Sequence, residues 1–236
     1  MKYTLEICYI VFILIYSYAI THFVPKKLYS FVNIFLALGA ILFGVTLGNL
    51  NITLLGLNKQ YMIHSLLIGV LISIPIILLV YTVALNPKFS KHFYEVPSKN
   101  YNRKTFAYEL LFRVPFGTAF SEEVIFRSVL LGLLLVNHPN SIAIFVSAIL
   151  FGLWHIFPTL KNLENNDTLH QKNNPNKQTS NLIATITNVV STILIGIFFA
   201  IVAIETQSFI ATWVIHTTIN GISIFCGYFL VWKGKR

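Results

Sequence analysis

The sequence predicts an all-α polytopic membrane protein: a helical bundle of about seven transmembrane helices with one possible interfacial helix. The 236-residue chain is 56% hydrophobic and only 11% charged, and its mean hydropathy is +0.72. Soluble globular domains carry about twice that share of charged residues. The apolar residues fall into runs of about 20, the length that a helix needs to cross a bilayer. Lysine and arginine gather between alternate runs, as they do in membrane proteins.

The first part of the chain, 1–104, is expected to hold three transmembrane helices and a basic cytoplasmic loop. Lys2 precedes the first apolar run, as in a signal peptide, but the run is long and lacks a convincing cleavage site. Lys26 and Lys27 follow it directly, so we expect a retained helix. Pro75 predicts a kink in the third helix. The three spans are expected at 5–24, 28–50 and 61–85, and the polar, basic loop at 86–104.

The second part, 105–236, is expected to form a separate transmembrane core. Its first apolar stretch, 105–136, would be roughly 48 Å long as one helix, too long for a hydrocarbon core of roughly 30 Å. Pro115 is the expected point of division. Tyr108, Glu109 and Arg113 would make the preceding piece an amphipathic interfacial helix. We then expect a span at 116–136, a turn at 137–140, a helix at 141–157, a flexible loop at 159–180, and spans at 181–204 and 208–232.

The distribution of basic residues predicts the orientation in the membrane. With the N-terminus outside and the C-terminus cytoplasmic, thirteen basic residues fall on the inner side and two, Lys2 and Lys59, on the outer side. The net charge of +9 therefore reflects membrane topology, and we expect no nucleic-acid partner. The Asn-, Lys- and Ile-rich usage points to an A+T-rich bacterial genome, and we expect the protein in a bacterial plasma membrane. The thirteen are Lys26, Lys27, Lys88, Lys91, Lys99, Arg103, Lys104, Lys161, Lys172, Lys177, Lys233, Lys235 and Arg236.

Three ionisable residues stand together inside the span at 116–136. Glu122, Glu123 and Arg127 are surrounded by apolar residues on both sides. Ionisable groups at membrane depth are costly, so a functional role is the default hypothesis. Glu123 and Arg127 are four apart and share a helix face, so Arg127 can neutralise one carboxylate while Glu122 faces a cavity.

Two later spans add polar groups at the same spacing. His155 ends the segment 151–155, in which Gly152 allows close helix approach and Phe151 and Trp154 are expected to pack at the rim of a site. His216 and Asn220 are four apart in the last span. The other histidines lie at helix ends or in loops and are expected to be solvated: His22, His64, His92, His138 and His170.

Each of these groups also has a purely structural interpretation. A buried Glu–Arg pair can join helices, a single histidine is often a packed core residue, and His216 with Asn220 could hold helices together. Burying all of these polar side chains in apolar helices costs free energy unless they contact one another. This favours one shared site. The two cysteines, Cys8 and Cys226, allow neither a disulfide framework nor a cysteine metal site.

The three motifs, in order, resemble a known family. Glu122-Glu123-x-x-x-Arg127, Phe151-x-x-x-His155 and His216-x-x-x-Asn220 on separate membrane helices are similar to the motifs of the CAAX prenyl protease and bacteriocin-processing (CPBP, also called Abi) family of intramembrane glutamic endopeptidases. The resemblance covers about 116–221.

The resemblance implies how the site works. Glu122 and His155 would activate a water molecule, His216 and Asn220 would stabilise the oxyanion, and Glu123 with Arg127 would position the site. It implies a peptide or lipidated-peptide substrate at the bilayer and a reaction without metal or cofactor. The motifs do not name the substrate: prenylated proteins, bacteriocin leaders and signalling propeptides are all compatible with them.

Other classes of function remain open. Carboxylates and imidazoles are ordinary zinc ligands, but the sequence has no H-E-x-x-H motif. Activity that survives strong chelation would exclude a metal-dependent protease. A proton-coupled transporter would also use buried ionisable groups, although no internal repeat is visible. Some relatives confer self-immunity to bacteriocins or act as signalling scaffolds, and these roles need no catalysis.

Overall fold

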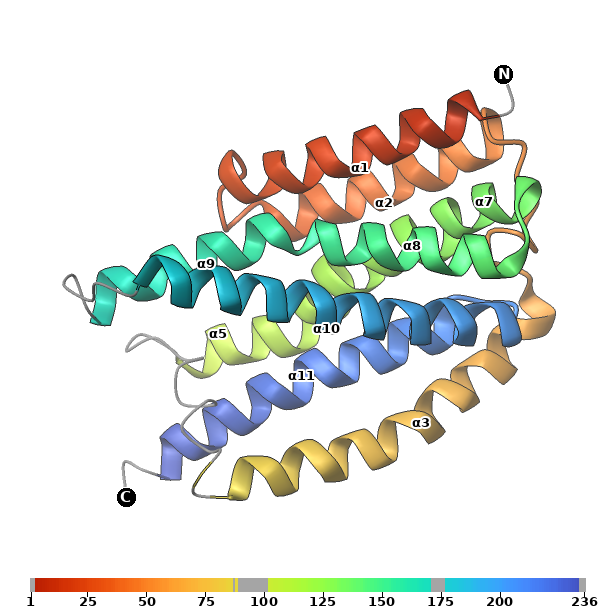
Figure 1. The fold of residues 1–236 in the computed structure, drawn as a ribbon. Coiled ribbons are helices and arrows are strands. Elements are labelled where there is room, and N and C mark those ends of the chain that lie inside the picture. The colour runs from red at the N-terminus through yellow and green to blue at the C-terminus, as the bar shows by residue number, and fades with distance from the viewer. Residues whose placement is uncertain (1–2, 87, 89–101, 171–176, 234–236) are drawn as a thin grey trace.

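The computed structural model describes residues 3–86, 88, 102–170 and 177–233, and every regular element in these ranges is a helix. The helices run side by side in one bundle, with the two termini at opposite ends (Figure 1). The prediction of an all-α helical bundle is therefore confirmed.

Within the described residues, six helices are long and apolar enough to cross a membrane. Many of their large apolar side chains are exposed, including Ile63 and Leu79 of the third, because lipid takes the place of a protein partner. The spans predicted at 5–24, 28–50, 61–85, 181–204 and 208–232 are found within about five residues of their expected ends, whereas the helix predicted at 141–157 is continued by a second helix to His170. The helices are α1 (Thr4–His22), α2 (Tyr29–Thr46), α3 (Lys59–Leu85), α8 (Asn140–Trp154) continued by α9 (Ile156–His170), α10 (Lys177–Glu205) and α11 (Ile210–Lys233).

The predicted seventh span lies within a longer helical run that we call the site helix. It is helical from Arg103 to Asn137 with no break at Pro115, so the predicted division into an interfacial helix and a span is wrong. Its middle is π-helical on both sides of a short α-helical turn. Its segments are α5 (Arg103–Tyr108), η1 (Glu109–Phe120), α6 (Ser121–Glu123), η2 (Val124–Leu130) and α7 (Leu131–Asn137).

Side chains of α2, of α11 and of the site helix itself bond to the backbone of the site helix at and just after the proline. Three successive carbonyl groups, those of residues 115–117, each accept a hydrogen bond from a side chain. Trp213 Nε1 donates to Pro115 O at 2.7 Å, Asn33 Nδ2 donates to Gly117 O at 2.9 Å, and Ser121 Oγ donates to the carbonyl between them at 2.9 Å. These carbonyls follow the proline, whereas the carbonyl that loses its donor to Pro115 lies one turn earlier, so the three bonds attach the helix to its neighbours and do not replace the bond that Pro115 removes. Helices α2 and α11 are thereby attached to the site helix just before Glu122.

The prediction of a flexible loop at 159–180 is also wrong for the residues in this range that the structure describes. Helix α9 continues to His170 and α10 begins at Lys177, while 171–176 lie outside the described residues. The stretch 159–170 contains neither glycine nor proline, and asparagine costs a helix only about 0.7 kcal/mol relative to alanine. Asn188 Nδ2 also donates a hydrogen bond to Thr159 Oγ1 at 2.7 Å, which ties the start of α9 to α10. The loop predicted at 86–104 lies mostly outside the described residues.

A polar cluster joins the N-terminal helix to the turn between α7 and α8. His138 Nε2 lies 2.9 Å from Glu6 Oε2, and the Asn137 amide donates a hydrogen bond to the other carboxylate oxygen. Glu6 is buried. The prediction that His138 is solvated is therefore wrong. Its partner is a carboxylate 132 residues away in the chain, and the local sequence does not indicate this contact.

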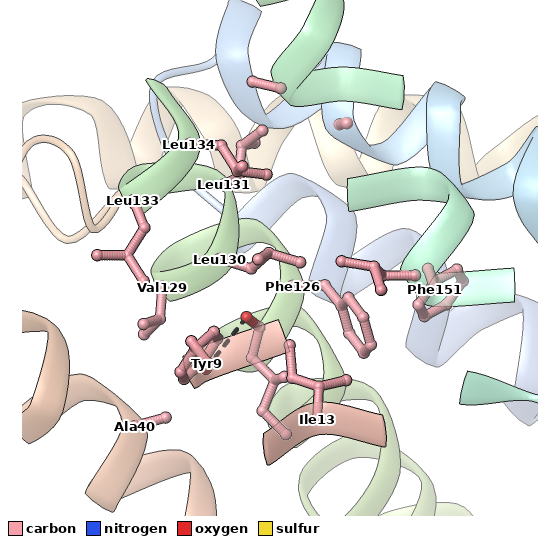
Figure 2. Close-up of a cluster of buried hydrophobic side chains, with 14 of the residues drawn as sticks. Tyr9, Ile13, Ala40, Phe126, Val129, Leu130, Leu131, Leu133, Leu134 and Phe151 are labelled. Atoms are coloured by element: carbon pink, nitrogen blue, oxygen red, sulfur yellow. Dashed lines mark hydrogen bonds between the residues drawn. The ribbon is translucent and has the colours of Figure 1, made fainter. Parts of the chain in front are cut away.

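The main hydrophobic core surrounds the second half of the site helix (Figure 2). Phe126 and Leu130 are fully buried between side chains of the neighbouring helices, among them Ile13 of α1 and Phe151 of α8. Tyr9 of α1 donates a hydrogen bond to the carbonyl oxygen of Ile125 at 3.3 Å, drawn in Figure 2. The core therefore fixes the site helix on the side of α1 and α8.

Close contact between α8 and α10 depends on Gly152, as the sequence predicted. A Cβ atom at this position would lie 2.3 Å from Ile193 Cγ1 and 3.0 Å from the carbonyl oxygen of Val189. We expect Gly152→Ala to lower the free energy of unfolding by about 1–3 kcal/mol, because neither helix can move without repacking.

Thermal unfolding in detergent checks this prediction, with Gly39→Ala on α2 as the matched control. A Cβ atom on Gly39 would meet nothing within 4 Å. The control should therefore unfold at the wild-type temperature or above it. Equal unfolding temperatures for the two variants would contradict the packing described for α8 and α10.

Candidate active site

Three parts of the fold bring the predicted polar residues together. The short helix α6 and the start of η2 carry Glu122, Glu123 and Arg127. Helix α8 ends at its C-cap residue, His155. Helix α11 contributes His216 from the opposite side. Five of the six predicted residues therefore form one cluster, linked by the distances given below.

Glu122 lies at the centre of this cluster. Its Oε2 atom is 3.9 Å from Nε2 of His155 and 3.9 Å from Nε2 of His216. These separations are too long for direct hydrogen bonds, but a bridging water or a substrate atom can span them. Glu122 is 6% exposed, and its Oε2 atom has no hydrogen-bond partner among the described residues.

Glu123 has a different environment, because it is held between a histidine and an arginine. Its Oε1 atom lies 2.8 Å from His216 Nδ1, and its Oε2 atom lies 3.4 Å from Arg127 Nε. The side chains of Glu123 and Arg127 are fully buried. A carboxylate can only accept, so His216 Nδ1 donates and the Nε2 atom of the same ring is turned toward Glu122.

Aromatic rings and a carbonyl group complete the surroundings of Arg127. Its guanidinium carbon lies 4.1 Å from the centre of the Phe151 ring and 5.2 Å from that of Phe199. Its Nη2 atom donates to the carbonyl oxygen of Gly196 at 3.4 Å. Phe151 was predicted to pack at the rim, but it is 2% exposed and lies between Arg127 and the His155 ring. Cation–π contacts of this kind partly replace the water that a buried charge loses.

The backbone fixes the tautomer of His155. Its Nδ1 atom lies 2.7 Å from the carbonyl oxygen of Phe151, one turn earlier in α8. A carbonyl oxygen can only accept, so Nδ1 carries the proton. In the neutral ring this leaves the lone pair on Nε2, the atom that faces Glu122. The His155 side chain is 22% exposed, so the cluster is most open on this side.

Asn220 is the predicted residue that the structure does not join to the cluster. It is half-buried on α11, one helical turn after His216, and its side chain makes no hydrogen bond to the described residues of the cluster. Its position leaves it on the same face of α11 as His216.

Sequence reasoning gave no role to Tyr29, which packs on the site helix before Glu122. Tyr29 begins α2, and its ring centre lies 5.2 Å from the guanidinium carbon of Arg113. Tyr29 belongs to no recognisable motif. A tyrosine at the start of an apolar helix carries no local signal, and its contact with the site helix depends on how α2 packs against η1.

Comparison with known families gives one match. A family model described as type II CAAX prenyl endopeptidase Rce1-like matches residues 105–222. Comparisons with curated proteins and with solved structures gave no match. The matched segment contains all six predicted site residues and begins where the transmembrane core was expected to begin. The chain belongs to the Rce1-like family of type II CAAX prenyl endopeptidases.

Proposed function

We propose that this protein is an intramembrane glutamic endopeptidase that hydrolyses a peptide bond in a peptide or lipidated-peptide substrate. One observation carries the proposal. The Oε2 atom of Glu122 lies at the same distance, 3.9 Å, from two imidazole nitrogens that come from different helices. A buried carboxylate flanked in this way can deprotonate a water molecule and hold it against a carbonyl group. The family match supports peptidase activity in general.

The first step is attack of water on the scissile carbonyl. A water molecule between Glu122 and His155 loses a proton to Glu122 as its oxygen attacks the carbonyl carbon. His155 accepts a hydrogen bond from this water through its Nε2 lone pair, which orients it. Negative charge moves to the carbonyl oxygen. The Nε2–H of a protonated His216 and the amide of Asn220 would donate to that oxyanion.

The second step is collapse of the tetrahedral intermediate. The C–N bond breaks, and the amine leaves with the proton that Glu122 took from water. The products are a new carboxylate and a new amine, so no cofactor is consumed. Glu122 returns to its starting state.

Glu122, rather than Glu123, takes the role of base because of what each carboxylate already contacts. Glu123 is engaged by His216 and Arg127. Its negative charge is balanced by the guanidinium, so it serves to position His216. Glu122 has no such counter-ion within 3.9 Å apart from the two imidazoles, as far as the described residues extend. It is therefore free to exchange a proton with water.

We further propose that the site opens toward the cytoplasmic face of a bacterial plasma membrane. The termini lie at opposite ends of the bundle, as an odd number of crossings requires (Figure 1). The excess of lysine and arginine on one side supports an orientation with the N-terminus outside and the C-terminus in the cytoplasm.

Mass spectrometry of membrane peptides tests the proposal in cells. Cells that carry the wild-type chain should contain cleaved peptides that are missing from cells with Glu122→Gln. Glu164→Gln is the matched control, because Glu164 is 70% exposed on α9 and is not part of the cluster. If Glu122→Gln and His155→Ala both keep full biological activity, the protein acts as an immunity factor or scaffold and the proposal is wrong.

A further inference from the structure

His155 lies at a break between two helices. Helix α8 ends at Trp154 and α9 begins at Ile156, and the ψ angle of His155 is −5°, whereas an α-helix has about −42°. Pro158 accounts for the break, because it has no N–H to donate to the carbonyl oxygen of Trp154, four residues earlier. The carbonyl group directly before His155 therefore lacks its α-helical donor and needs another one.

Ser17 of α1 supplies that donor. Its Oγ atom donates a hydrogen bond to the carbonyl oxygen of Trp154 at 2.7 Å, and the serine is buried. A serine within a helix commonly bonds to the carbonyl four residues earlier in its own helix, as Ser73 of α3 does to Gly69 O at 2.7 Å. Ser17 instead bonds across 137 positions of the chain, to the carbonyl that Pro158 leaves free.

Tyr16, the neighbour of Ser17 on α1, holds the side chain of the same tryptophan. The rings of Tyr16 and Trp154 are stacked with their centres 5.7 Å apart. The Tyr16 hydroxyl donates to Asn33 Oδ1 at 2.6 Å, and Asn33 Nδ2 donates to Gly117 O at 2.9 Å. A continuous series of contacts therefore runs from the residue before His155, through α1 and α2, to the site helix.

These contacts determine how His155 is placed against Glu122. The Nε2 atom of His155 lies 3.9 Å from Glu122 Oε2, and the proposed mechanism places the attacking water between these two atoms. A misplacement of about 1 Å at such a site can cost about 100-fold in rate. Without the hydroxyl of Ser17, the Trp154 carbonyl would turn to find another donor. The backbone of His155 shares that peptide unit and would turn with it.

We propose that Ser17 is a positioning residue for catalysis: by bonding the carbonyl that Pro158 leaves free, it holds the helix break at which His155 faces Glu122. This inference rests on the endopeptidase function proposed above. It extends the catalytic machinery from the segment that matches the family, residues 105–222, to helix α1. Ser17 acts through His155 and not on the substrate, so its loss should slow the chemical step and leave substrate binding nearly unchanged.

Steady-state kinetics of the full-length protein in proteoliposomes test the proposal. The probe is an internally quenched S-farnesyl peptide ending in Cys-Val-Ile-Met. We expect Ser17→Ala to lower kcat about tenfold and to leave KM within about twofold of wild type, because the water is oriented less well. Ser73→Ala is the matched control. It also removes a buried serine hydroxyl, but one whose bond lies within α3, so it should keep wild-type kcat and KM.

A double-mutant cycle shows whether Ser17 acts through His155. In a His155→Ala background the ring that Ser17 positions is absent, so adding Ser17→Ala should change kcat by less than about twofold. A general weakening of the fold would instead lower kcat by the same factor in both backgrounds. A raised protein concentration keeps the residual activity of this background measurable.

Restoring the helical donor separates positioning from stability. Pro158→Ala provides an N–H that can bond to the Trp154 carbonyl in place of the serine hydroxyl. The double variant Ser17→Ala/Pro158→Ala should therefore recover most of any unfolding temperature that Ser17→Ala loses. Its kcat should stay at least about fivefold below wild type, because the break at His155 is no longer held. The double variant also serves if Ser17→Ala alone folds poorly.

The possible failures can be told apart. If Ser17→Ala lowers kcat no more than Ser73→Ala, or lowers it equally with and without His155, the positioning role is refuted while the endopeptidase function stands. Recovery of kcat together with stability in Ser17→Ala/Pro158→Ala also refutes it, since Ser17 would then only satisfy a carbonyl. If the wild type does not cut the probe, the same variants are compared by the cleaved membrane peptides that cells lose with Glu122→Gln, with the same expectations. If the wild type produces no such peptides, the proposed function fails and this inference fails with it.

Discussion

Replacing Glu122 with glutamine is expected to lower kcat by about 10³- to 10⁴-fold, the largest effect of any single substitution in this protein. The amide keeps the shape of the side chain but cannot take a proton from water. Glu122 has no direct hydrogen bond at Oε2 within the described part of the chain, so the folded state should lose little stability. The measurement is kcat on a fluorogenic peptide in proteoliposomes, together with thermal unfolding of the same sample.

Glu164→Gln serves as the control, since it makes the same chemical change at an exposed position. It should keep wild-type kcat and unfolding temperature. A Glu122→Gln variant that retains more than about a tenth of wild-type kcat would mean that another group is the base.

Replacing Glu123 with glutamine is expected to damage both folding and catalysis. Arg127 would remain fully buried without a counter-ion, and breaking a buried ion pair in this way costs about 3–5 kcal/mol. His216 would lose the charged acceptor that fixes its ring, so the oxyanion donor would be misplaced. Thermal unfolding and kcat in the same detergent measure the two effects.

A double variant separates the two roles of Glu123. Glu123→Gln combined with Arg127→Met removes both charges and should recover most of the lost stability, because an apolar pair can replace a buried ion pair. Its kcat should stay low, since His216 is still unsupported. Recovery of kcat together with stability would show that Glu123 only holds the fold.

Much of the fold could be predicted because the bilayer restricts the choice of structure. A run of about 20 apolar residues in lipid must satisfy its own backbone hydrogen bonds, so α1, α2 and α3 follow from composition and length alone. The same reasoning identifies Glu122, Glu123 and Arg127. Charged residues inside such apolar runs are rare, and they pair with other polar or charged groups.

The remaining features depend on partners far away in the sequence. Asn33 and Trp213 attach the site helix to its neighbours at Pro115 and Gly117, and neither donor can be assigned from the local sequence. His138 is held by Glu6, from the other end of the chain. The contact of the Tyr29 ring with Arg113 likewise requires the packing of α2 to be known.

The most direct test of the account is a double-mutant cycle between Glu122 and His155. The two side chains come from different helices, and in the proposed mechanism both bind the same water molecule. We expect the double variant Glu122→Gln/His155→Ala to lose about as much kcat/KM as Glu122→Gln alone, because residues that act as a unit are not additive. If the two losses instead multiply, Glu122 and His155 act independently and the shared catalytic site does not exist.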